Sequence, residues 1–313
     1  MNKPARKIEL RLGTRASLLA LQQAGWVKKR VEDLNPEVTV TLVHIKTSGD
    51  RLDFPLFSVG GKGLFVKEIE EALAKKEVDL AVHSAKDLPA VIPEGLDLIA
   101  FPEREDPRDA LVSQGGKRFG EIREGGKVGT GSLRRQAQVL NLRPDLEVVP
   151  IRGNLDTRLK KLTTLDLDAV VLASAGLHRM GWGDRIVDIF EPETMLPAIG
   201  QGALAIEARK GEEKVLRAVG PLDHAPTRIS VLAERAFLQR LGGGCQVPIA
   251  GLARTFSGKL HLTGLVAAVD GKKMVKGEVE GRLEDHTRLG NRLAEELLGR
   301  GAEEVLKEVY KVG

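Results

Sequence analysis

The chain has 313 residues, of which 42% are hydrophobic and 29% are charged, a composition that indicates a folded globular protein and excludes intrinsic disorder. Its 48 basic and 44 acidic residues leave a net charge of +4, which by itself does not indicate a nucleic-acid binder. A single cysteine excludes an internal disulfide, and no apolar run approaches the roughly 18 residues that a membrane span needs. We therefore expect a cytoplasmic protein.

The first hundred residues alternate between strand-like and helix-like patterns, as α/β proteins do. In chain order they predict a strand over 8–12, a helix from Ala20 to Leu34, a strand over 38–44, a helix over 64–76 and a strand over 78–83. These elements predict one α/β lobe.

A second set of elements follows a charged stretch at 103–108. It comprises a strand over 127–129, a helix over 133–142, a strand over 146–151, a helix over 154–163, a strand over 168–173 and a helix over 174–180. The proline-rich segment 191–197 then crosses back, and residues 203–207 add a strand to the first lobe. A double crossover predicts two hinged lobes of the periplasmic-binding-protein kind.

The last hundred residues have a different pattern. A helix over 226–241 leads to glycine-punctuated strands near 247–254, 259–269 and 273–280, and then to a helical tail. This order predicts a small C-terminal α+β domain.

Four loops that follow predicted strands share one chemistry. They are GTRAS at 13–17, VHSAKDLP at 82–89, GTGSLRR at 129–135 and IRGNLDTR at 151–158. They supply hydroxyls, helix N-termini that favour anions, and arginine forks that match carboxylate or phosphate geometry. Because open α/β sheets bind ligands beyond their strand ends, the four loops predict a small polyanionic ligand.

The chain lacks the signatures of nucleotide and metal binding. Gly129-Thr130-Gly131 has no third glycine of a dinucleotide fingerprint, no Gly-Lys pair precedes Ser or Thr, and the six histidines show no metal-ligand spacing. We interpret His83, at a strand end, as a hydrogen-bonded core residue. Asp87 is either a turn former before Pro89 or a carboxylate that stabilises a cation formed on the substrate.

The only cysteine, Cys245, follows three glycines. One glycine suffices to end a helix, so two more indicate that a bulky group comes close to the backbone. Another glycine-rich loop, at 60–65, is either a plain turn or a lid that carries Lys62 and Phe65 over the ligand.

Eight segments, in order over nearly the whole chain, share a family pattern. They are GTRAS at 13–17, GGKGLFVK at 60–67, VHSAKDLP at 82–89, REDPRDA at 104–110, GTGSLRRQ at 129–136, RGNLDTRL at 152–159, LPAIGQG at 196–202 and GGCQVPI at 243–249. These segments closely resemble the porphobilinogen deaminase family, whose members are also called hydroxymethylbilane synthases.

The resemblance implies a transferase of tetrapyrrole and haem biosynthesis. It implies that a dipyrromethane cofactor is bound covalently, through a thioether, to Cys245 and primes the head-to-tail joining of four porphobilinogen units with loss of ammonia. Each pyrrole carries an acetate and a propionate, which accounts for the cations in the loops. The implied partner is a small molecule, with no nucleic acid and no membrane, and the implied state is a monomer.

The matching motifs also imply a role for individual residues. Asp87 falls on the catalytic aspartate, whose carboxylate accepts pyrrole N–H bonds and balances the azafulvenium charge. Besides Cys245 and Asp87, the implied cofactor-binding residues are Lys86, Thr130, Ser132, Arg134, Arg135 and Arg158. The implied substrate-binding residues are Arg11, Arg15, Ser17, Arg152, Arg179 and Gln201. The resemblance implies no metal.

The family's fold implies three domains. They comprise residues 1–102 with 200–220, residues 103–199, and residues 221–313, which carry Cys245. Two positions depart from the commonest motifs: Gly131 stands where many relatives have serine, and Gly242 replaces a frequent acidic residue.

Two other classes of protein fit parts of the pattern. A hinged anion-binding receptor or regulator domain would have the same two lobes but would need neither Cys245 nor Asp87. A nucleic-acid binder would require a contiguous basic face, against which the mixed charge argues. A cofactor adduct on the denatured chain would distinguish the deaminase from both.

Overall fold

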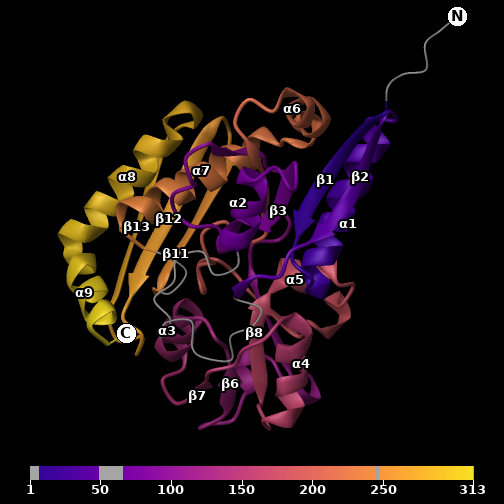
Figure 1. Cartoon of the computed structure of the whole chain (residues 1–313). Helices are drawn as coiled ribbons and strands as arrows, with labels where there is room; N and C mark the ends of the chain where they lie inside the picture. Colours follow the sequence, from indigo (N-terminus) through magenta and orange to yellow (C-terminus); the bar gives the residue numbers. More distant parts are fainter. Residues whose placement is uncertain (1–6, 49–65, 244–246, 313) are drawn as a thin grey trace, which may run out of the picture. The chain divides into compact units, whose positions relative to one another are not determined.

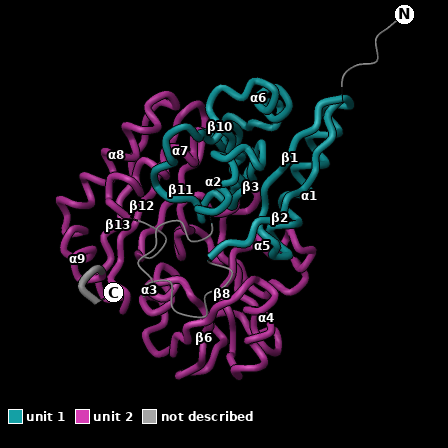
Figure 2. Tube along the Cα trace, in the orientation of Figure 1, with its two compact units in different colours: residues 1–52, 61–104, 203–228 teal, residues 53–60, 105–202, 229–313 magenta. Residues whose placement is uncertain are grey.

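The structure, a computed structural model, describes residues 7–48, 66–243 and 247–312, with the side chains of 310–312 left out. The described residues form two units, each considered by itself (Figure 2). The first contains residues up to 48, 66–104 and 203–228, and the second contains 105–202 and the residues from 229 onward. No helix among the described residues is long and apolar enough to cross a membrane.

The first unit is built on a five-stranded sheet in the order β2-β1-β3-β10-β4; β1, β2 and β3 are labelled in Figure 1. The strands are β1 (Ile8–Thr14), β2 (Val38–His44), β3 (Leu80–Ser84), β4 (Leu96–Ala100) and β10 (Leu204–Arg209). β1 pairs in parallel with β2 and β3, whereas β10 runs antiparallel between β3 and β4. The predicted return of the chain into the first sheet is therefore confirmed.

Helices cover both faces of this sheet. They are α1 (Leu18–Leu34), α2 (Lys67–Ala74) and α6 (Glu213–Val219). Leu80 and Val82 of β3 pack in one cluster with the buried face of α1, whereas Ala81 packs in another with Ile69 and Leu73 of α2. Because side chains alternate along a strand, odd-numbered residues of β3 face α2.

The second unit contains a similar five-stranded sheet, in the order β7-β6-β8-β5-β9. Its strands are β5 (Asp109–Ser113), β6 (Lys127–Gly129), β7 (Glu147–Val149), β8 (Ala169–Ala173) and β9 (Asp188–Phe190). Its helices are α3 (Leu133–Leu142), α4 (Leu155–Thr164) and α5 (Ser174–Arg179). Two apolar clusters, centred on Leu111 and on Leu172, form its core.

The same unit holds a three-stranded antiparallel sheet, which confirms the predicted C-terminal α+β region. Its strands are β11 (Ile249–Phe256), β12 (Lys259–Ala267) and β13 (Met274–Arg282). The helices are α7 (Ala225–Arg240), most of which belongs to this unit, α8 (His286–Leu297) and α9 (Glu303–Val312). Phe237 of α7 is fully buried against Gly251 and Gly264, which leave room for its ring. The division into three domains stays a prediction.

Four short elements have no counterpart in the sequence prediction: β4, β5, β9 and α6. β5 begins directly after the charged stretch at 103–108, and its first residue, Asp109, is a fully buried acid. A strand buried on both faces has no polar and apolar alternation to reveal it.

Candidate active site

The loop after β1 is shaped by a helix cap. Ser17 is the N-cap of α1, and its Oγ accepts a hydrogen bond from the Ala20 backbone N–H at 3.4 Å. Arg15 is half-buried in the same loop, and Thr14 is fully buried. Ser17 thus fixes the start of a 17-residue helix, and Arg15 lies two residues before this cap.

Arg11 differs from the other predicted cations. It lies within β1, is exposed, and forms an ion pair with Asp79 at 2.9 Å and a hydrogen bond to the Lys76 carbonyl at 2.7 Å. The hydrogen bond with Asp79 raises the pKa of Arg11. The structure does not bring Arg11 together with the loop at 14–17, and its predicted contact with substrate stays a prediction.

The loop after β3 carries Lys86 and Asp87 on a short 3-10 turn, Ala85–Asp87. Both side chains are half-buried, whereas Ala85 and Leu88 are buried and fix the turn. Within the described parts of the chain, Asp87 has no hydrogen-bond or ion-pair partner. The carboxylate of Asp87 is therefore available to a ligand.

His83, just before this loop, is the hydrogen-bonded core residue that the sequence predicts. Its Nε2 lies 2.9 Å from Glu207 Oε2, and the two side chains are 3% and 0% exposed. The residue that sequence reasoning missed is Glu207, since nothing in the order of residues pairs it with His83 across 124 positions.

The loop after β6 repeats the cap of the first unit. Ser132 is the N-cap of α3, and its Oγ accepts a hydrogen bond from the Arg135 backbone N–H. Thr130 is buried, and its Oγ1 accepts a hydrogen bond from the Ser132 N–H at 3.2 Å. A Cβ at Gly131 would clash with the Ile151 carbonyl oxygen, so this chain's backbone leaves no room for a serine there without a local shift.

Arg134 and Arg135 share one buried carboxylate, Asp109. Arg134 donates to Asp109 at 2.7 Å and to the Leu196 carbonyl at 2.8 Å. Arg135 donates to Asp109 at 2.9 Å and to the Val171 carbonyl at 3.1 Å. Burial alone would raise the pKa of Asp109, but the charges of the two arginines hold it well below its usual range.

This cluster contains more positive than negative charge. Gln201, which is 1% exposed, donates to Asp109 at 2.9 Å and accepts from Arg135 at 3.3 Å, so it adds no charge. The Nε of Arg134 is buried without a partner in the described part of the chain. The cluster therefore holds two guanidinium groups for one carboxylate.

Three further cations belong to the same unit: Arg152 lies in the loop between β7 and α4, Arg158 is on α4, and Arg179 is the last residue of α5. Arg158 of α4 donates from Nε to the Gly153 carbonyl at 2.8 Å. Burial lowers the pKa of Arg152. Burial also lowers the pKa of Arg179 to about 10, with Glu105 opposing the shift, and its guanidinium donates to the Gly202 carbonyl at 2.6 Å. A desolvated guanidinium is stabilised by an anion, so Arg152 and Arg179 fit carboxylate ligands.

Three predicted site residues, Cys245, Lys62 and Phe65, lie outside the described residues. The glycines before Cys245 are partly described. Gly242 has the positive φ of +67° that ends a helix, and a Cβ on Gly243 would clash with the Ile249 side chain. Internal packing thus accounts for Gly243 without an external group.

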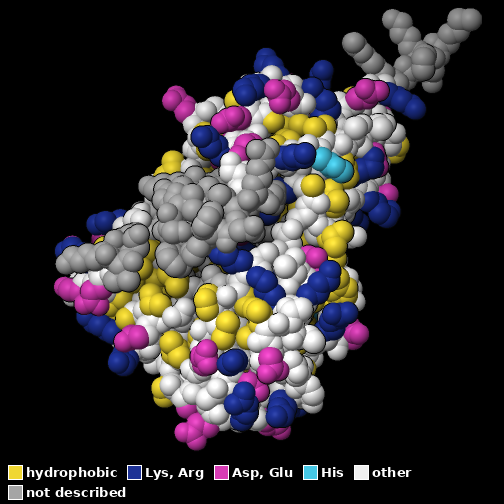
Figure 3. Space-filling view, turned by 60° about the horizontal axis from the view of Figure 1, so that its bottom comes forward, with side chains coloured by type: hydrophobic (Ala, Val, Ile, Leu, Met, Phe, Trp, Pro, Cys, Tyr) yellow, Lys and Arg dark blue, Asp and Glu magenta, His cyan; other side chains and the backbone are white. Residues whose placement is uncertain are grey.

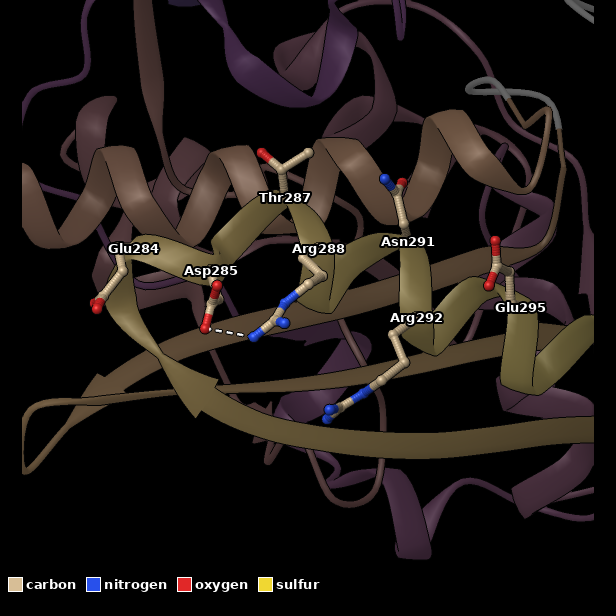
Figure 4. Close-up of a pocket in the computed structure, with 7 residues that line it drawn as sticks. All are labelled: Glu284, Asp285, Thr287, Arg288, Asn291, Arg292 and Glu295. Carbon is tan, nitrogen blue, oxygen red and sulfur yellow. Dashed lines mark hydrogen bonds and ion pairs between the residues drawn. The ribbon is translucent and has the colours of Figure 1, made fainter.

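The described residues also have charged surface features away from these loops. Within the described residues no group of three or more His, Cys, Asp or Glu side chains could hold a metal. A depression on the outer side of α8 is lined by charged side chains, such as Arg288 and Asp285, that pair with one another at 2.7 Å (Figure 4). Lys and Arg side chains are interspersed with Asp and Glu on the face in Figure 3.

Comparison with known proteins decides the family. Residues 10–217 match the model of the dipyrromethane cofactor binding domain of porphobilinogen deaminase, and residues 228–299 match that of its C-terminal domain. The chain belongs to the porphobilinogen deaminase family. Its activity is that of a porphobilinogen deaminase, with a dipyrromethane cofactor, in tetrapyrrole biosynthesis.

Full-length relatives agree. The chain is 54% identical to the porphobilinogen deaminase of Geobacter sp. (strain M21), covering 97% of this chain and 95% of that one. It is also 54% identical to the porphobilinogen deaminase of Pelobacter propionicus, covering 97% and 98%. The alternatives of a receptor and of a nucleic-acid binder are set aside.

Solved structures include more distant matches. A TRAP periplasmic solute binding protein from Desulfovibrio salexigens matches with a TM-score of 0.43 and 11% identity, over 69% of this chain and 72% of that one. A periplasmic binding protein from Salmonella typhimurium matches with a TM-score of 0.38 and 15% identity, over 69% and 91%.

Proposed function

We propose that the enzyme binds its cofactor and porphobilinogen through their carboxylates and that Asp87 is its catalytic residue. The observation that carries this proposal is the unpaired carboxylate of Asp87 in the described part of the chain. Asp79 and Asp109 are both engaged by arginines. A carboxylate left without a partner beside Lys86 is suited to a cationic reaction centre.

The residues fit a carboxylate-rich cofactor. Arg152 and Arg179 are partly desolvated cations, and the buried cluster of Arg134, Arg135 and Asp109 carries a surplus positive charge. We assign the cofactor to Cys245, by a thioether, and to a set of polar and basic side chains comprising Lys86, Asp87, Thr130, Ser132, Arg134, Arg135 and Arg158. When bound, the cofactor supplies the free pyrrole position from which the product chain is extended.

The role of Asp87 follows from its charge. Loss of ammonia from porphobilinogen leaves a cation on the substrate, and a carboxylate lowers the free energy of forming it. Asp87 can also accept the pyrrole N–H and take up the proton that is released when the new bond forms. A protonated histidine would repel the cation.

The remaining polar groups orient substrate carboxylates. We assign this role to Arg15, Ser17, Arg152, Arg179 and Gln201. Arginine matches both oxygens of a carboxylate, which fixes orientation as well as position. Holding the substrate in one orientation converts an encounter into a reaction within one complex. We further propose that the enzyme is a cytoplasmic monomer.

The covalent cofactor gives the direct test of this assignment. Under denaturing conditions the intact mass of the purified enzyme should exceed that of the polypeptide by one dipyrromethane, and peptide mapping should place the adduct on Cys245. Cys245→Ala should give a folded chain of bare mass without activity, because no other thiol is present. A wild-type enzyme of bare mass with full activity would contradict the proposal.

A further inference from the structure

A buried cluster of titratable groups lies beside the Asp87 loop. His83 of β3 and Glu207 of β10 are on adjacent antiparallel strands, where Ala205 is opposite His83 and Glu207 is opposite Ala81. Side chains two residues apart share a face, so both groups project from the α2 side of the sheet. Their 2.9 Å contact is almost fully removed from solvent.

Glu70 of α2 is the third member. One of its carboxylate oxygens and one of Glu207 are buried without a partner among the described residues. Burial, followed by the charge of Glu207, raises the pKa of Glu70 to about 7, and His83 opposes this shift. Near neutral pH the layer thus contains two carboxyl groups for one imidazole.

Among the described residues, the other charged groups on the neighbouring strands are either engaged elsewhere or exposed. α2 packs against β1, β3, β4 and β10. Arg11 of β1 and Arg209 of β10 both bind Asp79, while Glu9 of β1 and Asp97 of β4 are exposed. On α2 itself, Glu68 bonds to Ser48. Glu207 and His83 are the charges that act on Glu70.

The pair holds the end of β3 from one side of the sheet. On the other side, the Gln23 amide of α1 donates to Ser84 Oγ at 3.0 Å. The Ala85 N–H donates to the Ala203 carbonyl at 3.0 Å, in line with the β3 and β10 pairing. Since Lys86 and Asp87 follow within four residues of His83, these contacts determine where the 3-10 turn begins.

We propose that Glu207 is a positioning residue for the deaminase reaction: through His83 it fixes the turn that carries Lys86 and Asp87. The proposal rests on the role assigned above to Asp87. An ionised Glu70 repels Glu207 across an apolar layer and competes for His83, which displaces the pair. A misplacement of about 1 Å at a reacting group can cost on the order of 10²-fold in rate.

The test is Glu207→Gln in the full-length, cofactor-bearing enzyme. Glutamine keeps the shape but not the charge, so kcat should fall roughly 10-fold or more with KM changed less than about two-fold. The backbone amide NMR signals of Lys86 and Asp87 should shift, and Glu207→Asp should recover part of the activity. The matched control is Glu71→Gln, the same change at an exposed position of α2, which should alter neither kcat nor the amide signals of Lys86 and Asp87.

A second variant keeps the proposal falsifiable if Glu207→Gln does not fold. In the wild-type enzyme, kcat should decline above about pH 7 as Glu70 ionises. Glu70→Gln cannot ionise at this position, so its kcat should not show this decline. An unchanged kcat and pH profile in folded, adduct-bearing Glu207→Gln, or a fall in kcat without shifts at Lys86 and Asp87, would overturn the proposal. Shifted amide signals together with a fully active Asp87→Asn would instead remove the assigned role of Asp87 and leave Glu207 as the group that positions the turn.

Discussion

Two buried charge clusters, one in each unit, have surplus charges of opposite sign. In the first, Glu207 contacts one histidine, His83, and the carboxyl group of Glu70 is influenced by the charges of both. In the second, Arg134 and Arg135 surround one carboxylate, Asp109. A surplus carboxylate can be neutralised by a proton, as the pKa of Glu70 near 7 indicates. A guanidinium keeps its proton at any physiological pH, so the second cluster retains a charge that only an anion can balance.

The two clusters suit different roles because only one of the two surplus charges can be removed by a proton. A cluster that balances itself by protonation can hold a strand end without attracting a ligand. A cluster with a permanent positive charge lowers the free energy of a bound carboxylate. The carbonyl groups of Leu196 and Val171 satisfy N–H groups of the arginines without removing that charge.

The largest expected effect comes from breaking the arginine cluster. Asp109→Ala leaves two guanidinium groups buried without their carboxylate, and the free energy of unfolding should fall by about 3–5 kcal/mol. Urea denaturation would measure this, in a Cys245→Ala background so that bound cofactor does not contribute to stability.

The matched control for that experiment is Asp33→Ala, which removes an exposed partner of Lys29. An exposed pair contributes about 0–1 kcal/mol, so this control should change stability little. A loss below about 1 kcal/mol for Asp109→Ala as well would show that the two arginines do not depend on the shared carboxylate.

A smaller effect is expected from the carboxylate cluster and depends on pH. The pKa of Glu70 rises from 4.5 to about 7 on folding, so the folded state binds the proton more tightly. Its stabilising contribution is present in full below pH 4.5, declines as the pH rises to about 7, and stays lost above that. Glu70→Gln should reduce this pH-dependent loss of unfolding free energy by about 1–2 kcal/mol, a value that allows for the partial exposure of the Glu70 side chain.

Urea denaturation of Glu70→Gln and wild type at pH 5 and pH 8 would measure the difference, again in the Cys245→Ala background. The free energy of unfolding of the variant minus that of wild type should be more positive at pH 8 than at pH 5. Equal pH dependence in the two proteins would mean that Glu70 is not held protonated in the folded state, and the contrast between the two clusters would fail.

The sequence predicts the elements that have caps and periodicity. Helix α3 begins and ends at the predicted residues, 133 and 142, and its start is set by Ser132, which caps the first turn. β5 is missed because a short strand buried on both faces has no alternation, and β9 is missed because its three residues are too few to show a period. The bounds of an element can therefore be predicted where they depend on residues that are close in the sequence.

The contacts that organise the site are not local. Asp109 meets Arg134 across 25 residues and His83 meets Glu207 across 124. The motifs indicate that arginines gather at strand ends, but the order of residues does not show that two of them share one carboxylate. It also does not show that Gly243 makes room for Ile249.

Asp87, whose carboxylate has no partner among the described residues, is the group proposed to act in the transition state. The direct measurement is kcat for Asp87→Asn, which keeps the size and one hydrogen-bond acceptor but removes the charge. It is made on protein whose Cys245 adduct has been verified by mass and compared with Asp97→Asn, the same change at an exposed position in the same unit. The account predicts a fall in kcat of at least roughly 10²-fold for Asp87→Asn and none for the control. An adduct-bearing Asp87→Asn enzyme that turns over within a factor of a few of wild type would contradict it.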